Sequence, residues 1–176
     1  MFQKLIDFSH NFDFCFTVAK NDDKRLLIHA NEVFFQSTGY KAHDVLNKNC
    51  KFLQGGDTDP QHVENIRNSM KNKEATFQEI INYKKNGEPF VNRLIIIPVK
   101  DHIFGIQSIV EKKEKLLSLK DLQIDVADIN HYINNPLNIV TFRLEKGDIE
   151  KAAEALNRIR MFLLNAENPD RYPAVY

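Results

Sequence analysis

The sequence predicts an α+β domain, in which a five-stranded antiparallel sheet carries helices on one face, followed by an all-α helical hairpin. Two observations predict this class. Two strand-like runs precede, and three follow, a segment with helical spacing and frequent breaks. Beyond Glu111 the strand signals cease and apolar residues recur at helical steps. We therefore expect one domain over residues 1–111, with an N-terminal cap at about 1–13, and a second over 112–176.

Composition narrows the functional classes. The 176 residues include 24 Lys and Arg and 24 Asp and Glu, so the formal net charge is zero. A surface for nucleic acid or an anionic membrane needs a cationic excess, so neither partner is expected. The longest strongly apolar stretch, Leu94–Val99, is too short to cross a bilayer, and the N-terminus lacks a secretory signal. We expect a cytoplasmic protein with free thiols at Cys15 and Cys50.

Turn signals set the limits of the expected strands. The polar cluster Asn21–Lys24 separates two apolar runs and predicts a hairpin. Asn86-Gly87 favours a two-residue hairpin turn with positive φ between two longer runs. The strands are expected at residues 14–19, 26–30, 75–84, 89–100 and 103 to about 111.

The segment between the two strand groups carries helix signals. Asn31 is expected to cap a short helix that ends at Gly39, and Gly55-Gly56 interrupts the helical region. Asp59-Pro60 provides a cap followed by proline at the first helical position. The helix that follows places three apolar residues on one face: Val63, Ile66 and Met70.

The C-terminal segment predicts two amphipathic helices. The first stripe consists of Leu119, Leu122, Val126, Ile129, Ile133 and Val140. Lys146-Gly147-Asp148 provides a stop and a new cap, and the second stripe consists of Ile149, Ala152, Leu156, Ile159 and Leu163. Two such helices cannot bury their stripes alone. We therefore expect a four-helix bundle in a homodimer.

One short segment carries a motif with chemistry. Residues 47–55 read Asn-Lys-Asn-Cys-Lys-Phe-Leu-Gln-Gly, which places a thiol, amides and a cation close together. This segment resembles the pattern G-x-N-C-R-F-L-Q-G of light-oxygen-voltage (LOV) domains, the flavin-binding photoreceptors of the PAS family, with Lys51 in place of Arg and Asn47 in place of the leading Gly. The resemblance spans about residues 14–110 and includes Arg67, Asn82, residues 90–94 and residues 105–107.

The resemblance implies a PAS/LOV fold and a flavin cofactor, and the residue types agree. Asn82 and Asn92 carry donors and acceptors that suit the pyrimidine edge of a flavin, and Gln107 could reach the ring from the neighbouring strand. Lys51, Gln54 and Arg67 suit one phosphate, which implies FMN, although FAD with its adenylate tail outside stays an alternative. The complete expected cofactor site is Asn49, Lys51, Gln54, Arg67, Asn82, Asn92, Leu94 and Gln107.

The same resemblance implies a photochemical role for Cys50. In the family, blue light leads to a reversible bond between the cysteine sulfur and the flavin, so Cys50 is the expected adduct-forming residue. The Gln107 amide, which can present oxygen or nitrogen, is the expected switch. Two departures from the pattern have physical consequences. Lys51 offers the phosphate a point charge and no planar fork, and Asn47 must adopt the left-handed backbone that glycine would supply.

A second motif lies on the expected hairpin. His131-Tyr132-Ile133-Asn134-Asn135-Pro136-Leu137 resembles the H-box of histidine kinases, which implies a dimerisation and phosphotransfer domain with His131 as a possible phospho-acceptor. Tyr132 stands where that family carries the acidic base. Residues 138–176 contain no glycine-rich nucleotide loop, so we do not expect a complete kinase or any enzyme.

Three functions follow from these motifs. The first is a light-regulated module that acts on a separate histidine kinase or response regulator. The second is a phosphotransfer protein that uses His131, and the third is a redox flavoenzyme. We discount the third because no nicotinamide site or second catalytic group is visible.

Overall fold

The computed structural model describes residues 2–110 and, beyond them, residues 135, 143, 151, 154, 155, 158, 159 and 161. His131 and most of the predicted hairpin therefore lie outside the described residues. Of the second predicted stripe, Ile159 is described, and it is fully buried within the single chain. Among the described residues, no helix is long and apolar enough to cross a membrane.

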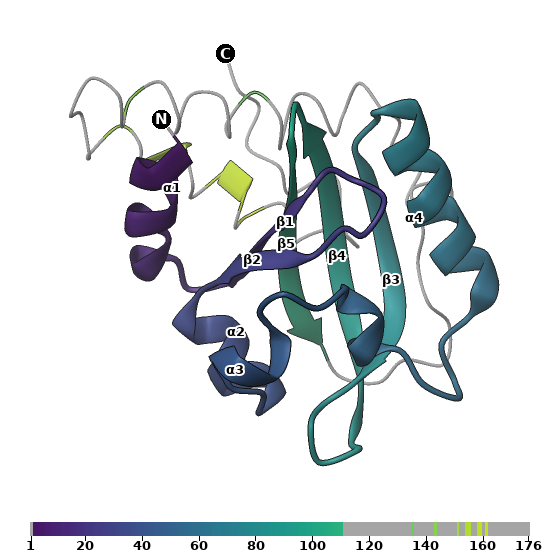
Figure 1. Cartoon of the computed structure of the whole chain (residues 1–176). Coiled ribbons are helices and arrows are strands. Elements are labelled where there is room, and N and C mark those ends of the chain that lie inside the picture. Colours follow the sequence, from purple (N-terminus) through teal and green to yellow (C-terminus); the bar gives the residue numbers. More distant parts are fainter. Residues whose placement is uncertain are drawn as a thin grey trace.

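The sheet has five strands, all paired antiparallel, as predicted (Figure 1). Its order is β2-β1-β5-β4-β3, so the two strand groups of the sequence join where β1 pairs with β5. The strands are β1 (Cys15–Lys20), β2 (Leu27–Ala30), β3 (Thr76–Tyr83), β4 (Pro89–Val99) and β5 (His102–Val110). The described helices are α1 (Phe2–Phe8), η1 (Ser9–Asn11), α2 (Glu32–Thr38), α3 (Ala42–Val45), η2 (Cys50–Leu53) and α4 (Pro60–Asn72).

The ends of α2 and the start of α4 lie where the sequence predicts. The Asn31 side chain accepts a hydrogen bond from the first turn of α2, and Gly39 ends that helix with φ of 73°. The Asp59 side chain caps α4, which begins at Pro60. The predicted left-handed backbone of Asn47 is also confirmed, with φ of 60°.

The connection between β3 and β4 differs from the predicted two-residue turn. Residues 84–88 separate the two strands, and Gly87 has a positive φ whereas Asn86 does not. The Asn86 side chain instead accepts a hydrogen bond from a backbone amide within the turn. The Lys85 ammonium group also binds Asp44 of α3 at 2.6 Å. The prediction of a two-residue turn was therefore wrong, and the connection is the longer turn of residues 84–88 with Gly87 at positive φ.

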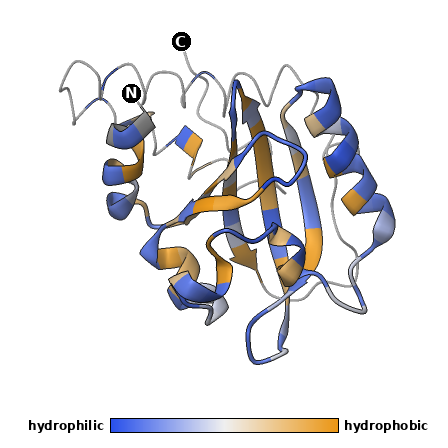
Figure 2. Cartoon of the chain, in the orientation of Figure 1, coloured by the Kyte–Doolittle hydropathy of each residue, from blue (hydrophilic) through white to orange (hydrophobic). Residues whose placement is uncertain are grey.

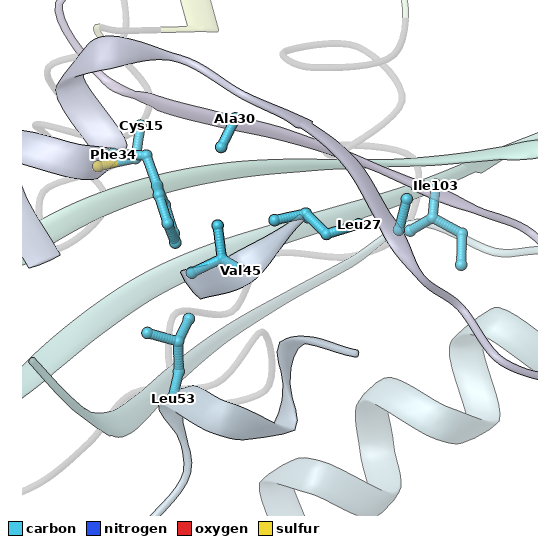
Figure 3. Packing of buried hydrophobic residues seen from close by; sticks show 8 residues of the cluster. Cys15, Leu27, Ala30, Phe34, Val45, Leu53 and Ile103 are labelled. Carbon is cyan, nitrogen blue, oxygen red and sulfur yellow. The ribbon is translucent and has the colours of Figure 1, made fainter. Parts of the chain in front are cut away.

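One face of the sheet, called the first face, carries the strand residues of the predicted site. This face lies under α2, η2 and α4 (Figure 1). Next to the site, an apolar cluster joins this face to β2 and to the short helices (Figure 3). Its labelled members are Cys15, Leu27, Ala30, Phe34, Val45, Leu53 and Ile103. The ribbon of α4 is mainly hydrophilic with short apolar stretches, as expected for a helix that covers a sheet with one face (Figure 2).

The second sheet face is also buried, which corrects the expectation of helices on one face only. Phe16 lies on this face because it alternates along β1 with Thr17, which lines the opposite side. Its ring contacts that of Phe12, just after η1, at 5.1 Å between centroids. The N-terminal segment therefore packs against the second face. Its aromatic side chains cover this face at β1, so the predicted N-terminal cap lies on the sheet.

A buried ion pair lies on the second face. Glu79 of β3 and Arg93 of β4 are cross-strand neighbours, and Glu79 Oε1 lies 2.8 Å from Arg93 Nε. The two side chains are 0% and 6% exposed. Both charges are therefore removed from water and depend on each other and on the surrounding protein.

Candidate functional site

A cavity of about 140 Å³ lies between the first sheet face and the helices η2 and α4. Every residue of the site predicted from the sequence lines it: Asn49, Cys50, Lys51, Gln54, Arg67, Asn82, Asn92, Leu94 and Gln107. The remaining wall is mainly apolar and comes from the sheet and from α4, including Ile80, Ile96, Ile103, Val63, Ile66 and Met70. An elongated aromatic ligand with a polar edge fits such a lining.

Buried amide side chains form a hydrogen-bonded row across the sheet side of this cavity. Asn92 Nδ2 donates to Asn82 Oδ1 and to Gln107 Oε1, both at 2.9 Å. Gln107 Nε2 in turn donates to the Thr17 hydroxyl oxygen at 3.2 Å. The row crosses β3, β4, β5 and β1, because the strand register places all four side chains on the same face.

The cavity contains polar atoms that the protein does not satisfy. Among the described residues, two buried side-chain atoms lack a hydrogen-bond partner, Asn92 Oδ1 and Arg25 Nε, and both residues line the cavity. A buried polar atom without a partner costs about 1–3 kcal/mol. Both the acceptor and the donor are therefore suited to a polar ligand.

Cys50 begins η2 in the wall of the cavity. The preceding Asn49 caps this short helix, since its Oδ1 accepts a hydrogen bond from the Lys51 backbone amide at 3.1 Å. Burial raises the pKa of the Cys50 thiol to about 11. The thiol therefore keeps its proton at neutral pH, where it is not a ready nucleophile on its own.

Cationic and polar side chains line one part of the cavity wall. Lys51 and Gln54 come from η2 and the residue that follows it, and Arg67 comes from α4. Arg67 also pairs with Glu64, with Nη1 and Oε2 3.1 Å apart and both side chains half exposed. An exposed pair of this kind contributes little to stability, so Arg67 remains able to bind an anion.

Comparison with known proteins places this site in a family. A family model described as a PAS domain matches residues 13–111. The chain belongs to the PAS family. A blue-light-activated histidine kinase of Brucella anthropi is 53% identical to it over 132 residues, which are 74% of this chain and 22% of that protein. The chain thus spans about a fifth of the length of this curated relative.

Solved structures identify the described part as a LOV domain. The LOV domain of the Erythrobacter litoralis EL346 blue-light activated histidine kinase is 35% identical, with a TM-score of 0.56, over 58% of this chain and 100% of that chain. A second LOV structure, described with a flavin analogue, is 30% identical, with a TM-score of 0.57, over 61% of this chain and 85% of that chain.

The structure adds three residues to the site of this LOV domain. Thr17 receives the Gln107 hydrogen bond, and alternation along β1 could have indicated its face. Gly105 leaves space for the Thr17 side chain, since a Cβ added at this position would collide with the Thr17 hydroxyl oxygen. Arg25 lines the cavity from the turn between β1 and β2, and no sequence pattern indicates it.

Asn49 lines the cavity as predicted and also has a local role within the protein. Its Oδ1 caps η2, and its Nδ2 donates to the Lys24 carbonyl at 2.9 Å. Both ends of its amide are therefore used by the protein, although the residue lines the cavity. Among the described residues of the LOV domain, no group of three or more His, Cys, Asp or Glu side chains could hold a metal ion.

Proposed function

We propose that this LOV domain is a blue-light receptor that holds FMN in the cavity and responds through Cys50. The observation that carries the proposal is that the Cys50 thiol, the amide row and the cationic side chains line one cavity. A bound flavin would supply the blue-light absorption and the ring carbon for a reversible bond, and Cys50 would provide the sulfur for that bond and give up its thiol proton to the ring.

The protein's own groups support this assignment. Asn82 and Asn92 would hold the pyrimidine edge, and the unpartnered Asn92 Oδ1 supplies an acceptor there. Leu94 and the apolar wall would exclude water from the ring. The raised pKa of Cys50 keeps a proton on Sγ, so that both sulfur and proton are available in the dark state.

Phosphate recognition favours FMN as the flavin. Lys51, Gln54 and Arg67 would bind a terminal phosphate with two charges and an amide donor. Riboflavin would leave these groups without an anion, whereas FAD would have to place its adenylate outside the cavity.

The identity of the cofactor can be tested on the purified full chain. Heat denaturation should release a yellow flavin, and its mass should be that of FMN. Chain that is purified without flavin should take up FMN and turn yellow. A preparation that contains no flavin and binds no added FMN would contradict the proposed function.

Gln107 is the proposed link between the flavin and the sheet. Its amide bonds both Asn92 and Thr17, so a rotation that exchanges its oxygen for its nitrogen would break the bond from Asn92 and reverse the direction of the bond with Thr17. We expect Gln107→Leu to bleach in blue light but to lose the light-dependent structural difference, measured by circular dichroism or limited proteolysis. Gln36→Leu, at an exposed position of α2, is the matched control and should respond normally. An undiminished structural difference in Gln107→Leu would exclude this role.

For the output, we propose that residues 112–176 form a dimeric four-helix bundle that signals to a separate histidine kinase or response regulator. The two apolar stripes in the sequence support this proposal. The alternative is a hairpin folded against its own sheet, and the burial of Ile159 within one chain agrees with that alternative as well.

Sedimentation of the full chain distinguishes the two arrangements. We expect a dimer at micromolar concentration. Ile129→Asp combined with Leu156→Asp should give a monomer, because each unpaired carboxylate between the packed apolar stripes of the proposed bundle costs several kcal/mol. A wild-type monomer in both dark and light would favour the folded-back hairpin, and His131 would then lack the dimeric setting that phosphorylation in trans requires.

A further inference from the structure

We propose that Arg25, in the turn between β1 and β2, is a ligand of the flavin phosphate and makes the cavity selective for phosphorylated flavins. This inference rests on the proposed function, because it assigns a further residue to the same site. Arg25 lies outside the motif segment and outside α4, the two elements that provide Lys51 and Arg67.

The turn that carries Arg25 is fastened to the segment that carries the thiol. Asp22 Oδ1 accepts hydrogen bonds from the backbone amides of Lys24 and Arg25, at 3.1 and 2.8 Å. The Asn49 side chain donates to the Lys24 carbonyl at 2.9 Å, and Leu26 forms a β-bridge with Asn49. The position of Arg25 is therefore fixed relative to Cys50, the residue directly after Asn49.

The backbone of Arg25 is held in an unfavourable conformation. Its φ is 48°, in the left-handed region that glycine and asparagine adopt more readily than arginine does. A glycine would relieve the turn of this strain. The presence of an arginine is best explained by what its side chain does.

The side chain of Arg25 has an unsatisfied donor at the cavity. Its Nε is buried and has no hydrogen-bond partner, although the residue lines the cavity. An arginine presents its donors in a planar fork that matches two oxygens of a phosphate. Nε–H is one of the donors of that fork, so a phosphate would supply the missing acceptor.

The other cations at the cavity leave a place for this contact. Lys51 offers a point charge where the family pattern has an arginine, and Arg67 shares its charge with Glu64. Arg25 would provide a second guanidinium group, in place of the one that the family pattern has at the position of Lys51. A purely structural arginine would have its Nε–H bonded within the protein, and this one does not.

Comparison of two flavins tests the proposal, because FMN and riboflavin differ only in the phosphate. The dissociation constants of both flavins are measured with flavin-free full chain for the wild type and for Arg25→Gln. We expect Arg25→Gln to weaken FMN binding about 10- to 100-fold, the range for a charge-assisted hydrogen bond, and to leave riboflavin binding unchanged. Lys24→Gln, which removes an exposed charge from the same turn, should leave the FMN-to-riboflavin ratio unchanged.

Two further variants keep the test decisive if Arg25→Gln folds poorly. Arg25→Gly suits the positive φ of the turn and should show the same selective loss of FMN affinity. Arg25→Lys keeps the charge without the fork and should be intermediate. An unchanged ratio of the two affinities in Arg25→Gly, or an equal loss for both flavins, would overturn the role of Arg25. A wild-type chain that binds neither flavin would instead overturn the proposed function.

Discussion

Replacement of Cys50 by alanine is expected to abolish light-induced bleaching completely while the flavin stays bound. The amide row, the apolar wall and the cationic side chains are unaffected by this change, so binding should persist. The bleaching requires a sulfur at the cavity wall, and Cys50 is the cysteine that lines it. Absorption in the blue before and after illumination measures the effect.

Cys15→Ala is the matched control for Cys50→Ala. Cys15 is the other cysteine in the sequence, and it lies on β1 in the apolar cluster beside the cavity (Figure 3). Burial raises its thiol pKa to about 11 too, so the two cysteines share their acid–base chemistry and differ in position. We expect Cys15→Ala to bleach and recover. The assignment fails if Cys50→Ala still bleaches or if Cys15→Ala does not.

Removal of one partner from the buried Glu79–Arg93 pair is expected to produce the largest loss of stability. Glu79→Leu removes the Glu79 carboxylate from the buried Arg93 guanidinium, a change that costs about 3–5 kcal/mol in comparable pairs. Typical domains are stable by about 5–15 kcal/mol, so this variant should unfold at much lower denaturant concentration. The free energy of unfolding, from chemical denaturation followed by circular dichroism, tests this expectation.

Two comparisons separate the charge effect from a general loss of packing. Glu79→Leu combined with Arg93→Leu should recover part of the loss, because replacing both charges of a buried pair by apolar side chains costs less stability than replacing only one of them. Glu88→Gln breaks an exposed pair, in which Glu88 Oε1 lies 3.0 Å from Lys84 Nζ, and should cost far less stability than Glu79→Leu. A cost for Glu79→Leu as small as that for Glu88→Gln would contradict the account of the second sheet face.

The residues that line the cavity could be predicted from the sequence because strand alternation and the motif around Cys50 indicate the same site. Strand alternation places Asn82 and Asn92 on the same face of one hairpin, and the motif around Cys50 indicates the partner segment. The structure brings both to one cavity. The order of strands and helices followed in the same way from turn signals and helix caps.

The features that the sequence did not reveal depend on contacts between distant residues. Arg25 reaches the cavity only because its turn is bonded to Asn49, and no local pattern contains that information. The turn at Asn86-Gly87 contacts α3 through Lys85 and Asp44, and no local pattern contains that contact. The packing of Phe12 against Phe16 on the second sheet face depends likewise on tertiary contacts.

The absorption spectrum of the purified full chain shows whether this LOV domain responds to blue light through Cys50 and a bound flavin. The spectrum is recorded in the dark, directly after blue illumination, and again during incubation in the dark. We expect flavin absorption in the first spectrum, its loss in the second and its full return in the third. Flavin absorption that blue light leaves unchanged would contradict the account, and so would bleaching that never reverses.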